Sequence, residues 1–144
     1  MTRPIVSRAS TTWRGTLPEG KGAVSLDSSG AADLPVTWAA RAGGSTSGVT
    51  NPEELLGAAH SACFSMALTN ALASEGTPPD RLDVTADVTF SQTDGIESVH
   101  LVVVGSVPGV SGTQFEALAQ KAKKECPVSK ALKGTQIKLS ATLR

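Results

Sequence analysis

The sequence of 144 residues is poor in aromatic side chains and has no excess of charge of either sign. It contains no tyrosine, three phenylalanines and two tryptophans, and its 13 basic residues match its 13 acidic ones. Nucleic-acid binding needs a basic surface, and binding of single strands also needs stacking rings, so we expect no nucleic-acid partner. The length fits one globular domain, which we predict over residues 1–144.

Signal-like segments and additional cysteines are also missing. The stretch up to Trp13 has no apolar core of signal-peptide length and no later run suggests a membrane span, so we expect a cytoplasmic protein without a membrane partner. Only two cysteines occur, Cys63 and Cys126. Cytosolic thiols are kept reduced, so this pair does not indicate a structural disulfide framework. The two cysteines are either buried filler or chemically active.

Alternation of apolar and polar residues predicts strands in the second half of the chain. Residues 81–90 predict a strand with one solvent-exposed face. Residues 137–143 predict an edge strand or a strand buried on one face only. Residues 96–107 are apolar on both faces, which is typical of a central strand covered on both sides. Three short strands are plausible in the first fifty residues, at 5–13, 22–26 and 35–40.

Two helices interrupt these strands. Asn51 as N-cap, Pro52 at the first helical position and Glu54 three residues after the cap predict the start of the first helix, which should end near Gly76. Spacings of three and four predict one buried stripe along it, formed by Leu56, Ala59, Cys63, Met66 and Asn70. The first thiol is therefore predicted to face the core.

The second helix should begin near Thr113 and lead to the second thiol. Its apolar face consists of Phe115, Leu118, Ala119 and Ala122. One further turn of this face reaches Cys126, after which Pro127 redirects the chain. Both thiols thus lie on apolar helix faces, where free cysteine is common as buried filler, and periodicity alone leaves filler and chemistry both open.

Other kinds of site have little support in the sequence. The glycine-rich loop 43–48 lacks the Gly-Lys-Ser/Thr ending of a phosphate-binding loop and matches no dinucleotide fingerprint. His60 and His100 are too few for a zinc site unless Cys63 and a second subunit contribute. We therefore predict no metal site and no nucleotide-binding loop.

The residues around the first thiol form a long motif. Residues 51–68, Asn-Pro-Glu-Glu-Leu-Leu-Gly-Ala-Ala-His-Ser-Ala-Cys-Phe-Ser-Met-Ala-Leu, closely resemble the active-site helix of the OsmC/Ohr family, named for osmotically inducible protein C and organic hydroperoxide resistance protein. The family's second cysteine lies in a Cys-Pro segment after a later helix, and Cys126-Pro127 occupies that place. The Gly-Ala-Ala-His that ends at His60 resembles the OsmC branch more than the Ohr branch.

This resemblance implies an α+β fold in which antiparallel sheets enclose a long central helix in an intertwined homodimer. It also implies a thiol-dependent peroxidase for organic hydroperoxides, acting in oxidative-stress defence without a cofactor. Cys63 would attack the peroxide and become a sulfenic acid, and Cys126 would then form a disulfide with it. A dithiol reductant, either a lipoyl group or a protein thiol, would reduce this disulfide to the two thiols. The alternative is a non-catalytic module that binds an acyl or lipoyl group in an interfacial apolar pocket, and a third hypothesis is a structural domain with buried cysteines.

The chemistry also needs a cation, because burial of Cys63 would oppose its ionisation. The resemblance assigns this role to an arginine, for which Arg41 is the best match and Arg14 the second. Arginine keeps its charge and can hold the thiolate with one N–H group while another contacts the peroxide. A buried arginine needs a carboxylate partner, which the resemblance places at Glu53.

Two further hypotheses come from the residues near the thiol. His60 lies one turn before Cys63, so it either deprotonates the thiol or packs as a structural side chain. The small residues Ala58, Ala59 and Ala62 suggest an apolar entrance, which favours bulky organic hydroperoxides over hydrogen peroxide.

Helix geometry separates Glu53 from the thiol of its own chain. Ten residues of straight helix place Glu53 roughly 15 Å along the axis from Cys63 and about 80° around it. Antiparallel packing of two such helices across a symmetric dimer would bring each N-terminus near the middle of the other. We therefore predict that the Glu53 serving one Cys63 belongs to the partner chain.

Overall fold

The computed structural model describes residues 2–144, and its contacts divide into two compact units. The first unit ends at Pro52, and the second comprises Glu53–Arg144. That the two units form a single domain over residues 1–144 stays a prediction.

The first unit is built on a three-stranded antiparallel sheet in the order β1-β2-β3. Its strands are β1 (Ser10–Arg14), β2 (Lys21–Ser25) and β3 (Asp33–Val36), followed by the short helix α1 (Trp38–Ala42). Trp13 packs closely over Gly22, where an added Cβ would lie 2.9 Å from the indole ring. Glycine at this position therefore lets the ring lie against the sheet.

Two of the strands predicted in this unit need correction. The first begins only at Ser10, so the predicted residues before it lie outside any strand. The prediction of strand at 35–40 is wrong after Val36, because residues from Trp38 onward are helical. The Thr37 side chain accepts a hydrogen bond of 3.1 Å from the Ala40 N–H and caps this helix, a local signal that overrides the apolar pattern.

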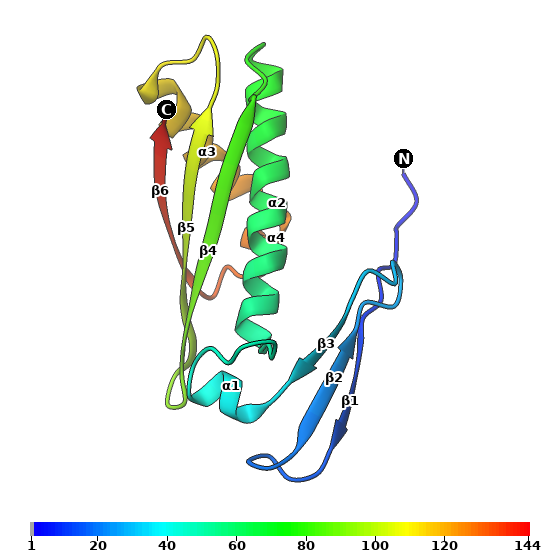
Figure 1. The fold of residues 1–144 in the computed structure, drawn as a ribbon. Helices are drawn as coiled ribbons and strands as arrows, with labels where there is room; N and C mark the ends of the chain where they lie inside the picture. Colours follow the sequence, from blue (N-terminus) through cyan, green and yellow to red (C-terminus); the bar gives the residue numbers. More distant parts are fainter. Residues whose placement is uncertain (1) are drawn as a thin grey trace. The chain divides into compact units, whose positions relative to one another are not determined.

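The second unit is dominated by the long helix α2 (Pro52–Ser74), which begins at the predicted proline (Figure 1). Gly76 ends it in a left-handed conformation, with φ of 79°, two residues after the last helical one. The Thr77 N–H then bonds back to the Leu72 carbonyl at 3.0 Å, which satisfies one of the last helical acceptors. Both ends of this helix confirm the sequence prediction.

The sheet of the second unit has the order β4-β5-β6, with β4 (Arg81–Ser91) antiparallel to β5 (Gly95–Ser106). The third strand, β6 (Gln136–Leu143), is an edge strand as predicted, but it runs parallel to β5. The expectation of purely antiparallel sheets is therefore wrong. Two intervening helices, α3 (Gly112–Glu125) and α4 (Pro127–Ala131), carry the chain back to the end at which β5 starts, as a parallel connection requires.

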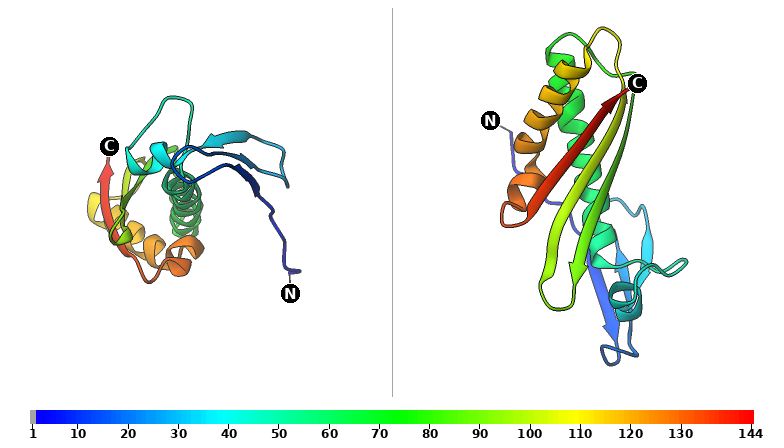
Figure 2. Two further views of the ribbon diagram at one scale, coloured as in Figure 1. Left: turned by 90° about the horizontal axis from the view of Figure 1, so that it is seen from below. Right: turned by 90° about the vertical axis from the view of Figure 1, so that its left-hand side faces the viewer.

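Helices α2 and α3 cover one face of this sheet (Figures 1 and 2). The core between them is apolar, with the β5 residues Val99, Leu101 and Val103 fully buried. The other face of β5 is only half-buried, and there His100 Nε2 pairs with Ser140 Oγ at 2.9 Å. The prediction that β5 is covered on both sides is thus wrong for the single chain.

The predicted buried stripe of α2 is also wrong. The residues that face the core are Glu53, Gly57, His60, Phe64, Leu68, Ala71 and Leu72. Met66 is 73% exposed, and Cys63 is half-buried at the edge of the core. Apolar residues are distributed all around α2, so its periodicity does not select one face, and packing on the sheet decides the orientation.

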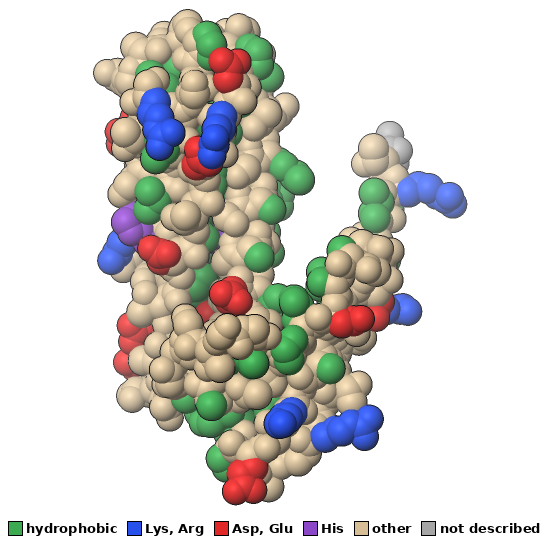
Figure 3. Space-filling model, in the orientation of Figure 1, with side chains coloured by type: hydrophobic (Ala, Val, Ile, Leu, Met, Phe, Trp, Pro, Cys, Tyr) green, Lys and Arg blue, Asp and Glu red, His purple; other side chains and the backbone are tan. Residues whose placement is uncertain are grey.

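The expectation that no run of the sequence suggests a membrane span is wrong for α2, which has the length and composition to cross a membrane. In the structure its residues Phe64, Leu68 and Leu72 are fully buried in the core, against the sheet and α3. Core helices of soluble proteins pass the same test of length and composition. The face drawn in Figure 3 mixes acidic and basic side chains, with hydrophobic ones scattered among them. We interpret α2 as the core helix of a soluble protein.

Candidate active site

The two cysteines of the chain meet in the second unit. Cys63 lies near the middle of α2, and Cys126 lies at the junction of α3 and α4. Both are free thiols, and their side chains lie side by side, where they interact with each other. The structure therefore brings together the pair that the sequence analysis selected.

The local sequence explains how Cys126 reaches this position. Its N–H bonds to the Ala122 carbonyl at 2.8 Å and closes the last turn of α3. Pro127 has no N–H and begins α4, whose first turn is closed by a 3.0 Å bond from the Lys130 N–H to the Cys126 carbonyl. The thiol is thus held at a sharp change of direction, with its side chain completely buried.

The surroundings of Cys63 raise the pKa of its thiol. Burial is the largest cause, and contact with Cys126 acts in the same direction. A hydrogen bond from the Val128 backbone N–H opposes them, because it stabilises the thiolate. Within the second unit the thiol is therefore mainly protonated at neutral pH, and the expectation that burial works against ionisation is confirmed. A peroxidase built on this thiol needs an additional positive charge near the sulfur.

His60 lies one helical turn before Cys63 but pairs with a different residue. Its Nε2 lies 2.7 Å from Ser129 Oγ, and both side chains are buried. Burial lowers the pKa of His60, so the ring is neutral near pH 7. Its Nδ1 is buried without a hydrogen-bond partner among the described residues. The geometry favours a structural role for His60 over deprotonation of the thiol.

Sequence reasoning missed the two α4 residues that complete this arrangement. Val128 contributes only its backbone N–H, and Ser129 contributes the hydroxyl that reaches His60. The one available signal was the Cys-Pro pair at a helix end, because a proline in the first turn of a helix orients the following N–H groups around the preceding residue.

The predicted charged residues fall into different units. Glu53 belongs to the first turn of α2, where it is only 6% exposed. Arg41 is half-buried in the last turn of α1, and Arg14 is exposed at the end of β1, both in the first unit. The pairing of either arginine with Glu53 or with the thiols stays a prediction.

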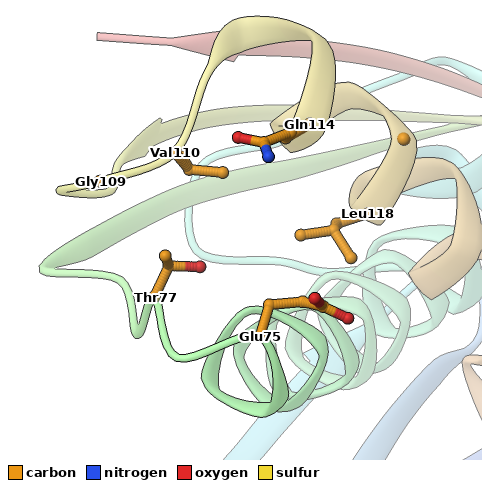
Figure 4. Close-up of a pocket in the computed structure, with 7 residues that line it drawn as sticks. Glu75, Thr77, Gly109, Val110, Gln114 and Leu118 are labelled. Carbon is orange, nitrogen blue, oxygen red and sulfur yellow. The ribbon is translucent and has the colours of Figure 1, made fainter.

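Metal binding has no visible site in residues 2–144, where no three His, Cys, Asp or Glu side chains gather as a ligand set. A cavity of about 410 Å³ lies at the C-terminal end of α2, between that helix, the loop after β5 and the start of α3 (Figure 4). It is lined by Glu75, Thr77, Gly109, Val110, Gln114, Ala117 and Leu118. It contains no thiol, so the cavity is separate from the cysteine pair.

Comparison with known proteins identifies the family. The family described as OsmC-like protein matches residues 44–140. Peroxiredoxin OsmC of Escherichia coli is 43% identical over 124 residues, covering 84% of this chain and 85% of that protein. The chain belongs to the OsmC family. The matched region contains Glu53 and both thiols, but neither of the candidate arginines.

Relatives from the Ohr branch are more distant. Organic hydroperoxide resistance protein OhrA of Bacillus subtilis is 38% identical over 87 residues, covering 59% of this chain and 61% of that protein. The crystal structure of an organic hydroperoxide resistance protein from Elizabethkingia anophelis covers 99% of this chain and 100% of its own, with a TM-score of 0.74 and 28% identity. The α+β OsmC-like fold, with two three-stranded sheets and a long central helix, is thereby confirmed. The higher identity with OsmC over the longer span agrees with assignment to the OsmC branch.

Proposed function

We propose that this chain is a thiol-dependent peroxidase that reduces organic hydroperoxides to alcohols in the cytoplasm, as part of oxidative-stress defence. Membership of the OsmC family supports the reaction class. The observation that carries the proposal is the contact between two reduced thiols that lie in separate helical segments. A purely structural role would not require the half-buried Cys63 to contact the buried Cys126.

The reaction balances with these two residues and an external dithiol. The Cys63 thiolate attacks the peroxide O–O bond, which releases an alcohol after protonation and leaves a sulfenic acid on Cys63. The Cys126 sulfur then attacks the sulfenic acid, so that water leaves and a Cys63–Cys126 disulfide forms. A dithiol reductant supplies two electrons and two protons and becomes a disulfide itself. We infer a lipoyl group or a protein thiol as this reductant.

The first half of the reaction has a direct test. One equivalent of cumene hydroperoxide should remove both thiols and produce a Cys63–Cys126 disulfide detectable by peptide mass spectrometry. Cys126→Ser should stop at a sulfenic acid that dimedone traps, and Cys63→Ser should not react. Unchanged thiols in the unmodified chain would leave only the binding module or the structural domain as the function.

We propose Arg41 as the cation that stabilises the Cys63 thiolate, with Glu53 holding its guanidinium. The raised pKa of Cys63 supports the need for such a cation, and the burial of Glu53 supports its role as a partner for a buried charge. Arg41→Lys should slow sulfenic acid formation strongly, because lysine lacks the fork of N–H donors, whereas Arg14→Lys should not. The opposite result would assign the role to Arg14.

We also propose that the chain acts as one domain, residues 1–144, in a homodimer that contains both units of each chain. An apolar side of α2, formed by Ala59, Ala62 and Met66, is exposed in the single chain. A second subunit packed against it would remove this apolar surface from water. Sedimentation should show a dimer, and Met66→Asp should weaken it. A monomer at micromolar concentration would contradict this proposal.

A mixed dimer tests whether Glu53 acts across the interface. The two parent variants are Cys63→Ser and Glu53→Ala. If Glu53 acts in trans, one site of the mixed dimer carries both defects and the other is intact, so about half the unmodified activity should return. Activity no higher than that of the two parents would place Glu53 and Cys63 of one site in the same chain.

Substrate preference follows from the residues beside the thiol. Ala58, Ala59 and Ala62 are small, apolar and exposed on α2 close to Cys63, which supports bulky organic hydroperoxides as substrates. The expected kcat/KM is higher for cumene hydroperoxide and tert-butyl hydroperoxide than for hydrogen peroxide. A steady-state comparison of dihydrolipoamide, thioredoxin and glutathione as electron donors would identify the reductant.

A further inference from the structure

The lysines of this chain are concentrated in one short segment. Six of the seven lysines lie between residues 121 and 138, where the only acidic residue is Glu125. This segment has a net charge of +5, so the rest of a chain with no net charge carries −5. Such a separation of charge gives the molecule one strongly attractive region for an anionic partner.

Four of these six lysines line one cavity in the folded chain. A cavity of about 530 Å³ lies between the end of α3, α4 and the start of β6. We call it the lysine groove, and it is lined by Lys123, Lys124, Ser129, Lys130, Lys133, Thr135 and Ile137. Lys124, Lys130 and Lys133 are exposed. Lys123 is half-buried, and its Nζ donates a 3.3 Å hydrogen bond to the Ile137 carbonyl. Three cations therefore remain available to an incoming group.

The lysine groove borders the segment that carries the second thiol. Ser129, which lines the groove, lies three residues after Cys126, and its hydroxyl pairs with His60, three residues before Cys63. A molecule seated in the groove would therefore contact the segment that holds both thiols in place. Four of the seven residues that line the groove are lysines, so it favours an anionic partner over a neutral one.

We propose that the lysine groove docks the protein that reduces the Cys63–Cys126 disulfide, through an acidic surface next to that protein's dithiol. This inference rests on the proposed function, because it names the class of partner for its second half-reaction. The separation of charge supports a protein with an acidic surface, because the groove attracts it while the remaining net charge of −5 repels it elsewhere. Docking adds no chemical step, since the dithiol still gives two electrons to the disulfide and becomes a disulfide.

Two synthetic probes of equal size test this docking. Both are heptapeptides with a central dihydrolipoyl-lysine, which is flanked in one by six aspartates and glutamates and in the other by six asparagines and glutamines. The full chain is first oxidised with cumene hydroperoxide, and the rate constant for reduction of its disulfide is then measured with each peptide. At low salt the acidic peptide should react roughly tenfold faster, and the difference should disappear at high salt.

Lysine variants locate the effect on the protein. The triple variant Lys124→Gln, Lys130→Gln and Lys133→Gln should lose the preference for the acidic peptide but react unchanged with dihydrolipoamide, which carries no net charge. Lys21→Gln is the matched control outside the groove and should keep the preference. If the triple variant is misfolded, the rate should instead fall with both peptides and with dihydrolipoamide. The test is then repeated with each single lysine variant.

The outcomes separate the two proposals. If no disulfide forms with cumene hydroperoxide, the proposed function is wrong. If the disulfide forms but both peptides reduce it equally fast, or if the triple variant keeps the preference, only the docking site is wrong. If sedimentation shows that the triple variant has lost a self-association of the unmodified chain, the groove seats a second copy of this protein, and the proposed partner is wrong.

Discussion

Replacing Ser129 by alanine should destabilise the protein through the buried histidine that Ser129 contacts. His60 is completely buried, and its Nε2 pairs with Ser129 Oγ at 2.7 Å. The other ring nitrogen, Nδ1, is already buried without a partner among the described residues. Ser129→Ala would therefore leave both polar atoms of the ring buried and unsatisfied.

The size of the effect follows from the cost of a buried polar atom that has lost its hydrogen bond, about 1–3 kcal/mol. Ser129 is itself only 5% exposed, so water has little access to replace its hydroxyl. Removal of both partners should cost less, because no ring nitrogen is then left unsatisfied. We therefore expect Ser129→Ala to cost less in a His60→Leu background than in the unmodified chain.

Urea unfolding at one fixed protein concentration measures this loss as a change in the free energy of unfolding. Ser74→Ala is the matched control, because the exposed Ser74 hydroxyl donates at 2.8 Å to a carbonyl of its own helix. We expect little change there. Ser129→Thr keeps the hydroxyl and should recover part of the loss. If Ser129→Ala costs no more than Ser74→Ala, the buried hydrogen bond does not stabilise the fold and the reasoning fails.

The pH dependence gives an independent readout of the same histidine. Burial lowers the pKa of His60 in the folded state, so below its ordinary value of about 6.5 the unfolded chain binds more protons. The stability contributed by the neutral ring is therefore present above about pH 6.5 and is lost as the pH falls toward the folded-state pKa. His60→Leu should remove this part of the profile, and an unchanged profile would mean that His60 does not contribute to it.

Three further variants test the core and the thiol. Gly105→Ala should cost about 1–3 kcal/mol in urea unfolding, because the added Cβ would lie 2.6 Å from the ring of the buried Phe115, whereas Gly112→Ala meets no atom within 4 Å and should be nearly neutral. Leu68→Ala should cost about 2–5 kcal/mol, since its side chain is completely buried, and a loss below 1 kcal/mol would show that the cavity collapses. The raised pKa of Cys63 means that its contribution to stability is present below about pH 8.5 and declines as the pH rises through the folded-state pKa, and Cys63→Ser should abolish this decline.

Local signals explain how far the sequence predicts the fold. Pro52 at the start of α2 and the glycine after its end act through backbone conformation, which neighbouring residues determine. Strict alternation along β4 and β6 likewise predicts strands, because a half-buried sheet has a period of two residues. The direction of β6 is not local, since it depends on how two helices return the chain to the sheet, and its parallel pairing was missed.

The sequence by itself determined the family, the two candidate thiols and the helical segments that carry them, because the motif around Cys63 and the Cys126-Pro127 pair are continuous in the chain. Only the tertiary structure decided which side of α2 faces the core. Apolar residues surround that helix, so burial of Phe64 and exposure of Met66 result from packing against the sheet and α3. The same packing brings α4 onto α2 and creates both the contact between the thiols and the His60–Ser129 pair. No local pattern encodes these contacts, because each joins residues that only the folded chain places together.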